Sequence, residues 1–271
     1  MVSIPFLPSL WSAGSGRGPQ ASPHRRGTAL ALGGGGMFGM GYDLGVAHGL
    51  RDGGIDLDRA PSIATSAGVW AASALALDVG FETFDALEAP TVPNLQSGVL
   101  ADIARDLFGE ARSPLVRATV VSLRTGRRRL LDGRHHALAD LCAASSAVPG
   151  LLPPHTVGGV TYVDGGVRSN TAVDIAPRAD HLIVITPLAG QTIFPVGRAQ
   201  EVLLAAETRL YKRRNPGADV TVIRPNRQIA AMAGTNPMNL FDADLGRAVY
   251  PLAVEQGRRR ADRLVERDLA A

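Results

Sequence analysis

Residues 28–50 read "TALALGGGGMFGMGYDLGVAHGL", in which four consecutive glycines separate an apolar, strand-like segment from a helix-like one. Glycine is poorly suited to the interior of a strand or a helix, because it loses more backbone freedom on folding than any other residue. The run therefore predicts a backbone that bends sharply or meets a ligand closely. Two kinds of site need such a loop: one that binds a phosphate group and one that stabilises an oxyanion.

Apolar runs of strand length recur along the chain and alternate with helix-like stretches. The runs cover residues 29–32, 62–65, 116–121, 181–186 and 219–223, and the helix-like stretches cover residues 40–52, 67–77, 98–108, 136–144, 198–214 and 243–267. This alternation is typical of an α/β protein in which helices cover both faces of a mainly parallel sheet. We therefore expect a three-layer α/β/α sandwich, with one hairpin within residues 116–131.

The expected domain covers residues 28–271, with no internal repeat and no second domain. Residues 1–27 are rich in Gly, Ser and Pro and predict a flexible N-terminal tail. Arg25 and Arg26 leave a twin-arginine export signal as an alternative, although the apolar segment after them is needed as a core strand. Residues 78–113 are the least regular part of the domain, and we expect them to form a short cap over a pocket.

Composition narrows the function classes. Basic side chains number 28 against 25 acidic ones and only 5% of residues are aromatic, so nucleic-acid binding is not expected. The single cysteine, Cys142, excludes an internal disulfide and a cysteine-based zinc site, and no His, Asp and Glu cluster predicts a metal or another cofactor. No apolar stretch approaches the roughly 20 residues of a membrane span. We expect a cytoplasmic protein, whose basic runs at 212–214 and 258–260 are solvated helix faces or contact anionic lipid headgroups peripherally.

The glycine run also satisfies the pattern G-x-G-x-x-G, at residues 34–39 between a strand and a helix. This pattern is the fingerprint of a dinucleotide-binding loop, which also needs an acidic residue at the end of the next strand to hold a ribose hydroxyl. Here the next expected strand runs into Ser66 instead. A nucleotide-binding protein is therefore an alternative, but the acidic residue that its motif needs is missing here.

Ser66 lies in "ATSAG", between a short apolar strand and the start of a helix. With Ala64 and Gly68 two positions to either side, the segment approximates G-x-S-x-G, the nucleophile elbow, in which a tight turn requires small neighbours. Ala64 departs from the glycine that is usual at the first position. A serine at this place could equally serve as the N-cap of the helix.

Asp164 follows an extended segment in "VTYVDGGVRSN", residues 160–170. Gly165 and Gly166 permit an abrupt turn that leaves the carboxylate at the end of a strand, although Asp-Gly pairs are also common in hairpin turns. The combination decides between these interpretations. A loop rich in free N–H groups, an elbow serine and a strand-end aspartate are the three parts that acyl-ester hydrolysis needs.

These segments resemble the patatin-like phospholipase family. The resemblance runs from about residue 28 to the "EQGRRRA" near the end of the chain, and Asn170 matches an asparagine that often follows the aspartate. The segment "CAASSAVPGLLPP", residues 142–154, is similar to the one that precedes the aspartate strand in the family. The matching motif residues are Gly34, Gly35, Gly36, Met37 and Gly39 in the loop, Ala64, Ser66 and Gly68 in the elbow, and Asp164, Gly165 and Gly166 in the D-G-G motif.

The resemblance implies a serine acyl hydrolase without a cofactor, acting on phospholipid, lysophospholipid or another fatty-acyl ester. Ser66 would be the nucleophile and Asp164 its base, as a dyad without histidine. The oxyanion hole would be formed by the amides of the loop, at Gly34, Gly35, Gly36 and Met37. Such a dyad should stay active at mildly acidic pH, below the pKa near 6.5 of an ordinary imidazole.

Alternatives remain at this stage. The family usually has Arg or Lys where this chain has Phe38, and this difference, with Ala64, leaves a catalytically impaired lipid-binding protein as a second hypothesis. An acyltransferase would use the same acyl-enzyme. His181 follows Asp164 in the order of the α/β-hydrolase triad, but it begins an apolar strand, so we expect activity to survive His181→Ala.

Overall fold

The computed structural model describes residues 27–85, 90–190, 192 and 195–269, so the expected N-terminal tail lies almost entirely outside the described residues. The strands are β1 Thr28–Leu32, β2 Ser62–Ala64, β3 Val116–Ser122, β4 Arg128–Asp132, β5 His155–Val157, β6 Val160–Asp164, β7 His181–Ile185 and β8 Asp219–Ile223. The helices are α1 Gly36–Asp52, α2 Ala67–Leu77, α3 Phe81–Asp85, α4 Val99–Phe108, α5 Leu138–Ser145, α6 Val196–Arg214, α7 Arg227–Met232 and α8 Ala243–Leu269. Short 3₁₀ helices are η1 Gly165–Val167, η2 Val173–Ile175 and η3 Pro237–Phe241.

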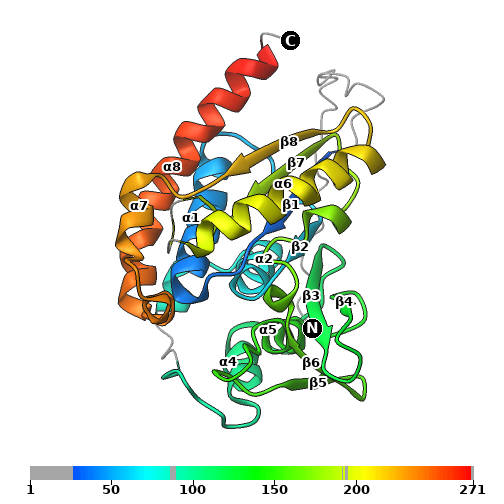
Figure 1. Cartoon of the computed structure of the whole chain (residues 1–271). Helices are drawn as coiled ribbons and strands as arrows, with labels where there is room; N and C mark the ends of the chain where they lie inside the picture. The colour runs from blue at the N-terminus through cyan, green and yellow to red at the C-terminus, as the bar shows by residue number, and fades with distance from the viewer. Residues whose placement is uncertain (1–26, 86–89, 191, 193–194, 270–271) are drawn as a thin grey trace, which may run out of the picture.

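One eight-stranded sheet forms the centre of the molecule, in the order β5-β6-β3-β2-β1-β7-β8, with β4 paired to β3 (Figure 1). Side chains alternate across it, as period-2 geometry requires. Leu30 and Leu32 of β1 join the core beneath α1, α2 and α8, whereas Ala29 and Ala31 join the core beneath α6. Helices thus cover both faces, and the expected α/β sandwich is confirmed.

The sheet has a parallel flank and an antiparallel flank, which meet on β3. β2 runs parallel to β3 and pairs with its first half, so that Ala64 lies opposite Ala118. β6 runs antiparallel to β3 and pairs with its second half, so that Asp164 lies opposite Val120. Because β4 pairs with β3 from Arg117 to Val121, β2 and β6 share the other edge of β3. The carboxyl ends of β2 and β6 therefore point toward each other, two residues apart along β3.

Helix α1 begins at Gly36, four residues before the start expected from the sequence, so the glycine run is partly helical. Glycines also recur inside α1, where the helix lies along α8. A Cβ atom at Gly41 would stand 2.3 Å from the carbonyl oxygen of Gly246, and one at Gly49 would stand 2.0 Å from that of Val254. The two helices touch through their backbones, and this packing offsets the low helix propensity of glycine.

Within the described ranges, no helix combines the length and the apolar character needed to cross a bilayer.

Candidate active site

Ser66 occupies a sharp turn between β2 and α2. Its backbone adopts φ 51° and ψ −123°, a region that a residue with a Cβ atom enters only at a cost of about 1–3 kcal/mol. Gly68 lets α2 start against β1, because a Cβ atom there would lie 2.5 Å from the carbonyl oxygen of Leu32. Ser66 stands at the N-cap position of α2, yet its side chain makes no cap hydrogen bond. The capping alternative is therefore wrong, and the hydroxyl is left for another partner.

A serine on α5 holds this turn in place. The Ser66 amide donates to Ser145 Oγ at 2.8 Å, and Ser145 Oγ donates to the carbonyl oxygen of Thr119 at 2.8 Å. The neighbouring Thr65 hydroxyl is hydrogen-bonded to the Thr119 hydroxyl at 2.5 Å. Because Thr119 is part of β3, the elbow is tied to the strand on which the two flanks of the sheet meet.

Asp164 ends β6 and caps η1. Its amide donates to the carbonyl oxygen of Ala147 at 3.0 Å, and the Gly166 amide donates to Asp164 Oδ1 at 2.6 Å. Gly165 lies against β3, where a Cβ atom would stand 2.4 Å from Thr119 Oγ1. The Asp-Gly pair is thus not a hairpin turn. It stops the strand abruptly and leaves the carboxylate facing the end of β2.

The structure brings Ser66 and Asp164 together, although they are far apart in the sequence. Burial raises the pKa of Asp164 to about 6, and hydrogen bonds from the Gly166 amide and the Ser66 hydroxyl act in the opposite direction. The residue is only 4% exposed, which explains why the loss of solvent has the largest effect on its pKa. A base is most effective when its pKa lies near the working pH, so this carboxylate is suited to accept the Ser66 proton.

The glycine loop lies beside Ser66, and one of its predicted oxyanion donors needs correction. The Gly34 amide donates to the carbonyl oxygen of Asn170 at 3.1 Å, so it is not a free donor. Asn170 Nδ2 in turn donates to the carbonyl oxygen of Gly34 at 3.2 Å. A Cβ atom at Gly34 would stand 3.0 Å from the Cβ atom of Ser66. Gly34 therefore positions the loop against the serine, and its amide is not available to an oxyanion.

The amides after Gly34 remain available. Gly36 and Met37 are the first residues of α1, where backbone N–H groups have no acceptor within the helix, and the Gly35 amide has no acceptor among the hydrogen bonds of the described residues. The amide of Ala67, the first residue of α2, likewise has no acceptor within its helix. Two helix N-termini thus meet beside Ser66, and their partial positive charges favour an anion there. The predicted roles of Gly35, Gly36 and Met37 stay predictions that this geometry permits.

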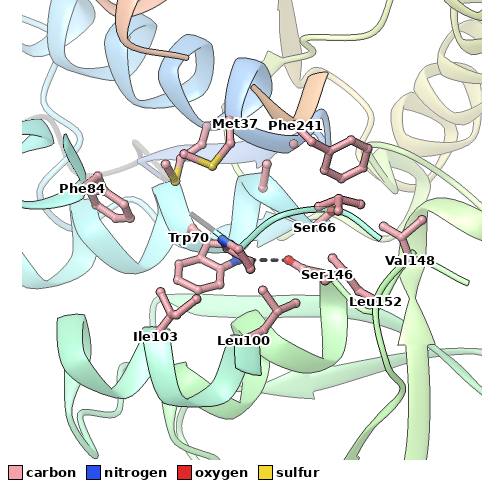
Figure 2. A pocket seen from close by; sticks show the side chains of 15 residues that line it. Met37, Ser66, Trp70, Phe84, Leu100, Ile103, Ser146, Val148, Leu152 and Phe241 are labelled. Atoms are coloured by element: carbon pink, nitrogen blue, oxygen red, sulfur yellow. Dashed lines mark hydrogen bonds between the residues drawn. The ribbon is translucent and has the colours of Figure 1, made fainter. Parts of the chain in front are cut away.

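A pocket opens beside the Ser66 side chain, with a volume of about 100 Å³ (Figure 2). Its lining is almost wholly apolar and comes from α1, α2, η3, the residues after α5, and residue 84 and residues 90–103 of the region expected to form a cap. Trp70, one helical turn after Ser66, lies in the pocket wall and donates from Nε1 to Ser146 Oγ at 2.9 Å. The other apolar side chains are Met37, Met40, Ala67, Phe84, Pro90, Val92, Leu100, Ile103, Val148, Leu152 and Phe241. An alkyl chain fits this lining, and a charged group does not.

Phe38 and the histidines lie away from this site. Phe38 is fully buried with its ring stacked on Tyr42, so the position at which the family has a cation belongs here to the core. His181 begins β7, its Nε2 is hydrogen-bonded to the Thr221 hydroxyl, and it lies about 13 Å along the strand from the carboxyl edge of the sheet. Within the described residues, no histidine is hydrogen-bonded to Ser66 or Asp164, and no cluster of His, Cys, Asp and Glu could hold a metal ion.

Three residues of the site carry no motif that sequence analysis could find. Ser145, Ser146 and Ala147 are consecutive and contact the Ser66 amide, the Trp70 indole and the Asp164 amide respectively. They lie in "CAASSAVPGLLPP", which the family resemblance singled out without giving them roles. Nothing in the sequence marks Trp70 as part of the site except its position one helical turn after Ser66.

Comparison with known proteins supports the resemblance. Residues 93–177 match the model of the patatin-like phospholipase family, a range that includes Asp164 and Asn170 but neither Ser66 nor the glycine loop. Among solved structures, one titled "Crystal structure of VipD from Legionella pneumophila" is 12% identical, covers 86% of this chain and 68% of its own, and gives a TM-score of 0.42. The curated proteins give no match. The predicted resemblance to patatin-like phospholipases is thereby confirmed.

Proposed function

We propose that the protein is a serine acyl hydrolase that cleaves fatty-acyl esters through a dyad of Ser66 and Asp164. The observation that carries the proposal is that Ser66 lines an apolar pocket, and its hydroxyl acts on the buried carboxyl group of Asp164 to lower that group's pKa, beside the amides that begin α1 and α2. The family match supports a lipid substrate, and the apolar lining favours a fatty-acyl chain over a charged or sugar group.

In the first half of the reaction, Asp164 accepts the Ser66 proton while Oγ attacks the ester carbonyl carbon. The carbonyl oxygen becomes an oxyanion, which the amides of Gly35, Gly36, Met37 and Ala67 stabilise. Removal of one such donor typically slows an acyl transfer by about a hundredfold or more. The tetrahedral intermediate then collapses, the alcohol leaves with the proton from Asp164, and the acyl group stays on Ser66.

In the second half, Asp164 takes a proton from water while the water oxygen attacks the acyl-enzyme. Collapse of this second intermediate releases the fatty acid, and the proton returns to Ser66 Oγ. An alcohol in place of water would give acyl transfer through the same steps. Phospholipid, lysophospholipid and other fatty-acyl esters remain the proposed substrate class, and the cytoplasmic location with peripheral membrane contact stays a prediction.

A fluorophosphonate probe tests the nucleophile directly. The wild type should be labelled on the peptide that contains Ser66 and should hydrolyse p-nitrophenyl esters of fatty acids. Ser66→Ala should lose the label and about three or more orders of magnitude of kcat/KM. Ser73→Ala is the matched control, because Ser73 is also buried on α2 and, among the described residues, its hydroxyl is hydrogen-bonded to Cys142 Sγ alone.

Two results would oppose the proposal. A wild type that binds fatty acid but neither reacts with the probe nor turns over esters would favour the impaired lipid-binding protein. A Ser66→Ala variant that keeps both label and activity would remove Ser66 from the mechanism. Products analysed with and without an added alcohol separate hydrolysis from acyl transfer.

A further inference from the structure

A second cavity, of about 350 Å³, lies between β8 and α8, away from Ser66. Its lining residues are Val222, Ile223, Arg224, Asn226, Gln256, Arg259, Arg260 and Arg263. Four of these side chains are arginines, and none is acidic. The cavity differs from the apolar pocket in both size and charge, and the proposed hydrolysis does not use it.

The cavity is built by the spacing of residues on two elements. Gln256, Arg260 and Arg263 recur at four and three residues along α8, so they lie on one face of the helix. Gln256 joins this face to the end of β8, since Nε2 donates to the carbonyl oxygen of Arg224 at 2.6 Å and Oε1 accepts from the Asn226 amide at 3.2 Å. Hydrogen bonds therefore join the two segments that line the cavity.

The charges in the cavity are only partly neutralised. Arg224 pairs with Glu201, with Nε 2.7 Å from Oε2, and Arg259 pairs with Glu255 at 3.0 Å. Arg260 donates to the neutral carbonyl oxygen of Val222 at 3.1 Å. Arg263 makes no ion pair with a carboxylate among the described residues. Within the part of the chain that the structure describes, the guanidinium groups of Arg260 and Arg263 thus have no anionic partner.

We propose that this cavity binds a phosphate group, held by Arg260 and Arg263. The planar guanidinium group presents paired N–H donors that match phosphate oxygens, and such charge-assisted hydrogen bonds are stronger than neutral ones. The site is distinct from the dyad, because β8 is separated from β2 by β1 and β7, a displacement of about 14 Å across the sheet. The phosphate could belong to a free anion or to the headgroup of an anionic lipid.

The two sources are distinguished by two titrations of the full chain at low ionic strength. One follows the binding of inorganic phosphate and of glycerol 3-phosphate by calorimetry. The other follows sedimentation with phosphatidylcholine vesicles that do or do not contain phosphatidic acid. Binding in either titration supports the site, and the titration that gives it identifies the source. An absence of binding in both overturns the proposal.

Arginine variants locate the binding. Arg260→Gln combined with Arg263→Gln should weaken the binding about tenfold or more, whereas Arg124→Gln combined with Arg129→Gln should leave it unchanged. The control pair removes the same charge from exposed positions on the β3-β4 hairpin. Equal weakening in both pairs would mean a response to net charge alone and would overturn the site. If the first pair lowers the melting temperature, Arg263→Gln alone, which breaks no hydrogen bond among the described residues, gives the same test with an expected loss of about threefold.

Discussion

The two flanks of the sheet each supply one member of the proposed dyad, and they fix it in different ways. On the parallel flank, the direction of Ser66 is set by its own turn, which combines a strained φ with a helix that begins at the next residue, and Ser145 on α5 holds its amide. On the antiparallel flank, Asp164 is set by contacts from distant segments, through Ala147 and β3. The strained turn is therefore particular to the serine, whereas contacts with α5 or the residues after it and with β3 hold both residues in place.

Replacement of the base on the antiparallel flank should give the largest effect. Asp164→Asn keeps the side-chain shape but cannot accept a proton, so kcat should fall about a thousandfold.

The same variant should be more stable than the wild type at pH 8. Because the folded-state pKa of Asp164 lies above its unfolded value of 3.8, ionisation of this carboxyl group destabilises the fold as pH rises from about 4 to about 6. Ester hydrolysis and thermal unfolding at pH 8 check the two effects; low activity with a lowered melting temperature would indicate a structural role instead.

The pH profile separates the two flanks, since only the antiparallel one carries the titrating group. With a pKa of about 6 for Asp164, kcat/KM should fall about tenfold between pH 7 and pH 5. This prediction differs from the expectation from the sequence that activity persists at mildly acidic pH, because burial moves the carboxyl pKa close to that of an imidazole. His181→Ala should leave both the rate and the profile unchanged. If the pH dependence is lost in His181→Ala, the titrating group is His181, and a histidine takes part in the mechanism.

Enlargement of the pocket on the parallel flank should change selectivity more than rate. The Trp70 ring packs against Phe108 and lies in the pocket wall, so Trp70→Ala should shift the ratio of kcat/KM toward longer acyl chains by about tenfold. Trp70→Phe keeps most of the ring and should keep the original preference. A panel of p-nitrophenyl esters measures the ratio. If Trp70→Ala leaves the preference unchanged, this pocket does not hold the acyl chain.

The smallest effect is expected at the link between the glycine loop and the segment after Asp164. Asn170→Ala retains the backbone oxygen that accepts from Gly34 but removes the Nδ2 donor, so kcat should fall severalfold with little change in KM. Asn215→Ala at the end of α6 is the control, because its Nδ2 also donates to a backbone oxygen, that of Tyr211. Equal losses in the two variants would show that Asn170 does not act by positioning the loop.

The sequence predicts the strands of the parallel flank well, since their apolar runs are long and lie between helices. It misses β5, which is three residues long and follows two prolines, and it starts α1 too late because glycine is normally unfavourable in a helix. Ser66 and Asp164 are predictable because their turns require small residues. Whether the Gly34 amide is a free donor cannot be predicted from the sequence. It depends on whether Asn170 accepts from this amide, and that contact forms only in the folded chain.

Three consecutive residues each accept a hydrogen bond from a different part of the site. Ser145 accepts from the Ser66 amide, Ser146 from the Trp70 indole and Ala147 from the Asp164 amide. A side-chain change at Ser145 or Ser146 would remove one contact at a time, and a change at Ala147 would keep the backbone oxygen that accepts from Asp164. Deletion or insertion of a single residue would instead shift all three at once, so that serine, indole and aspartate would each meet the wrong neighbour. This stretch should therefore tolerate substitution far better than any change in its length.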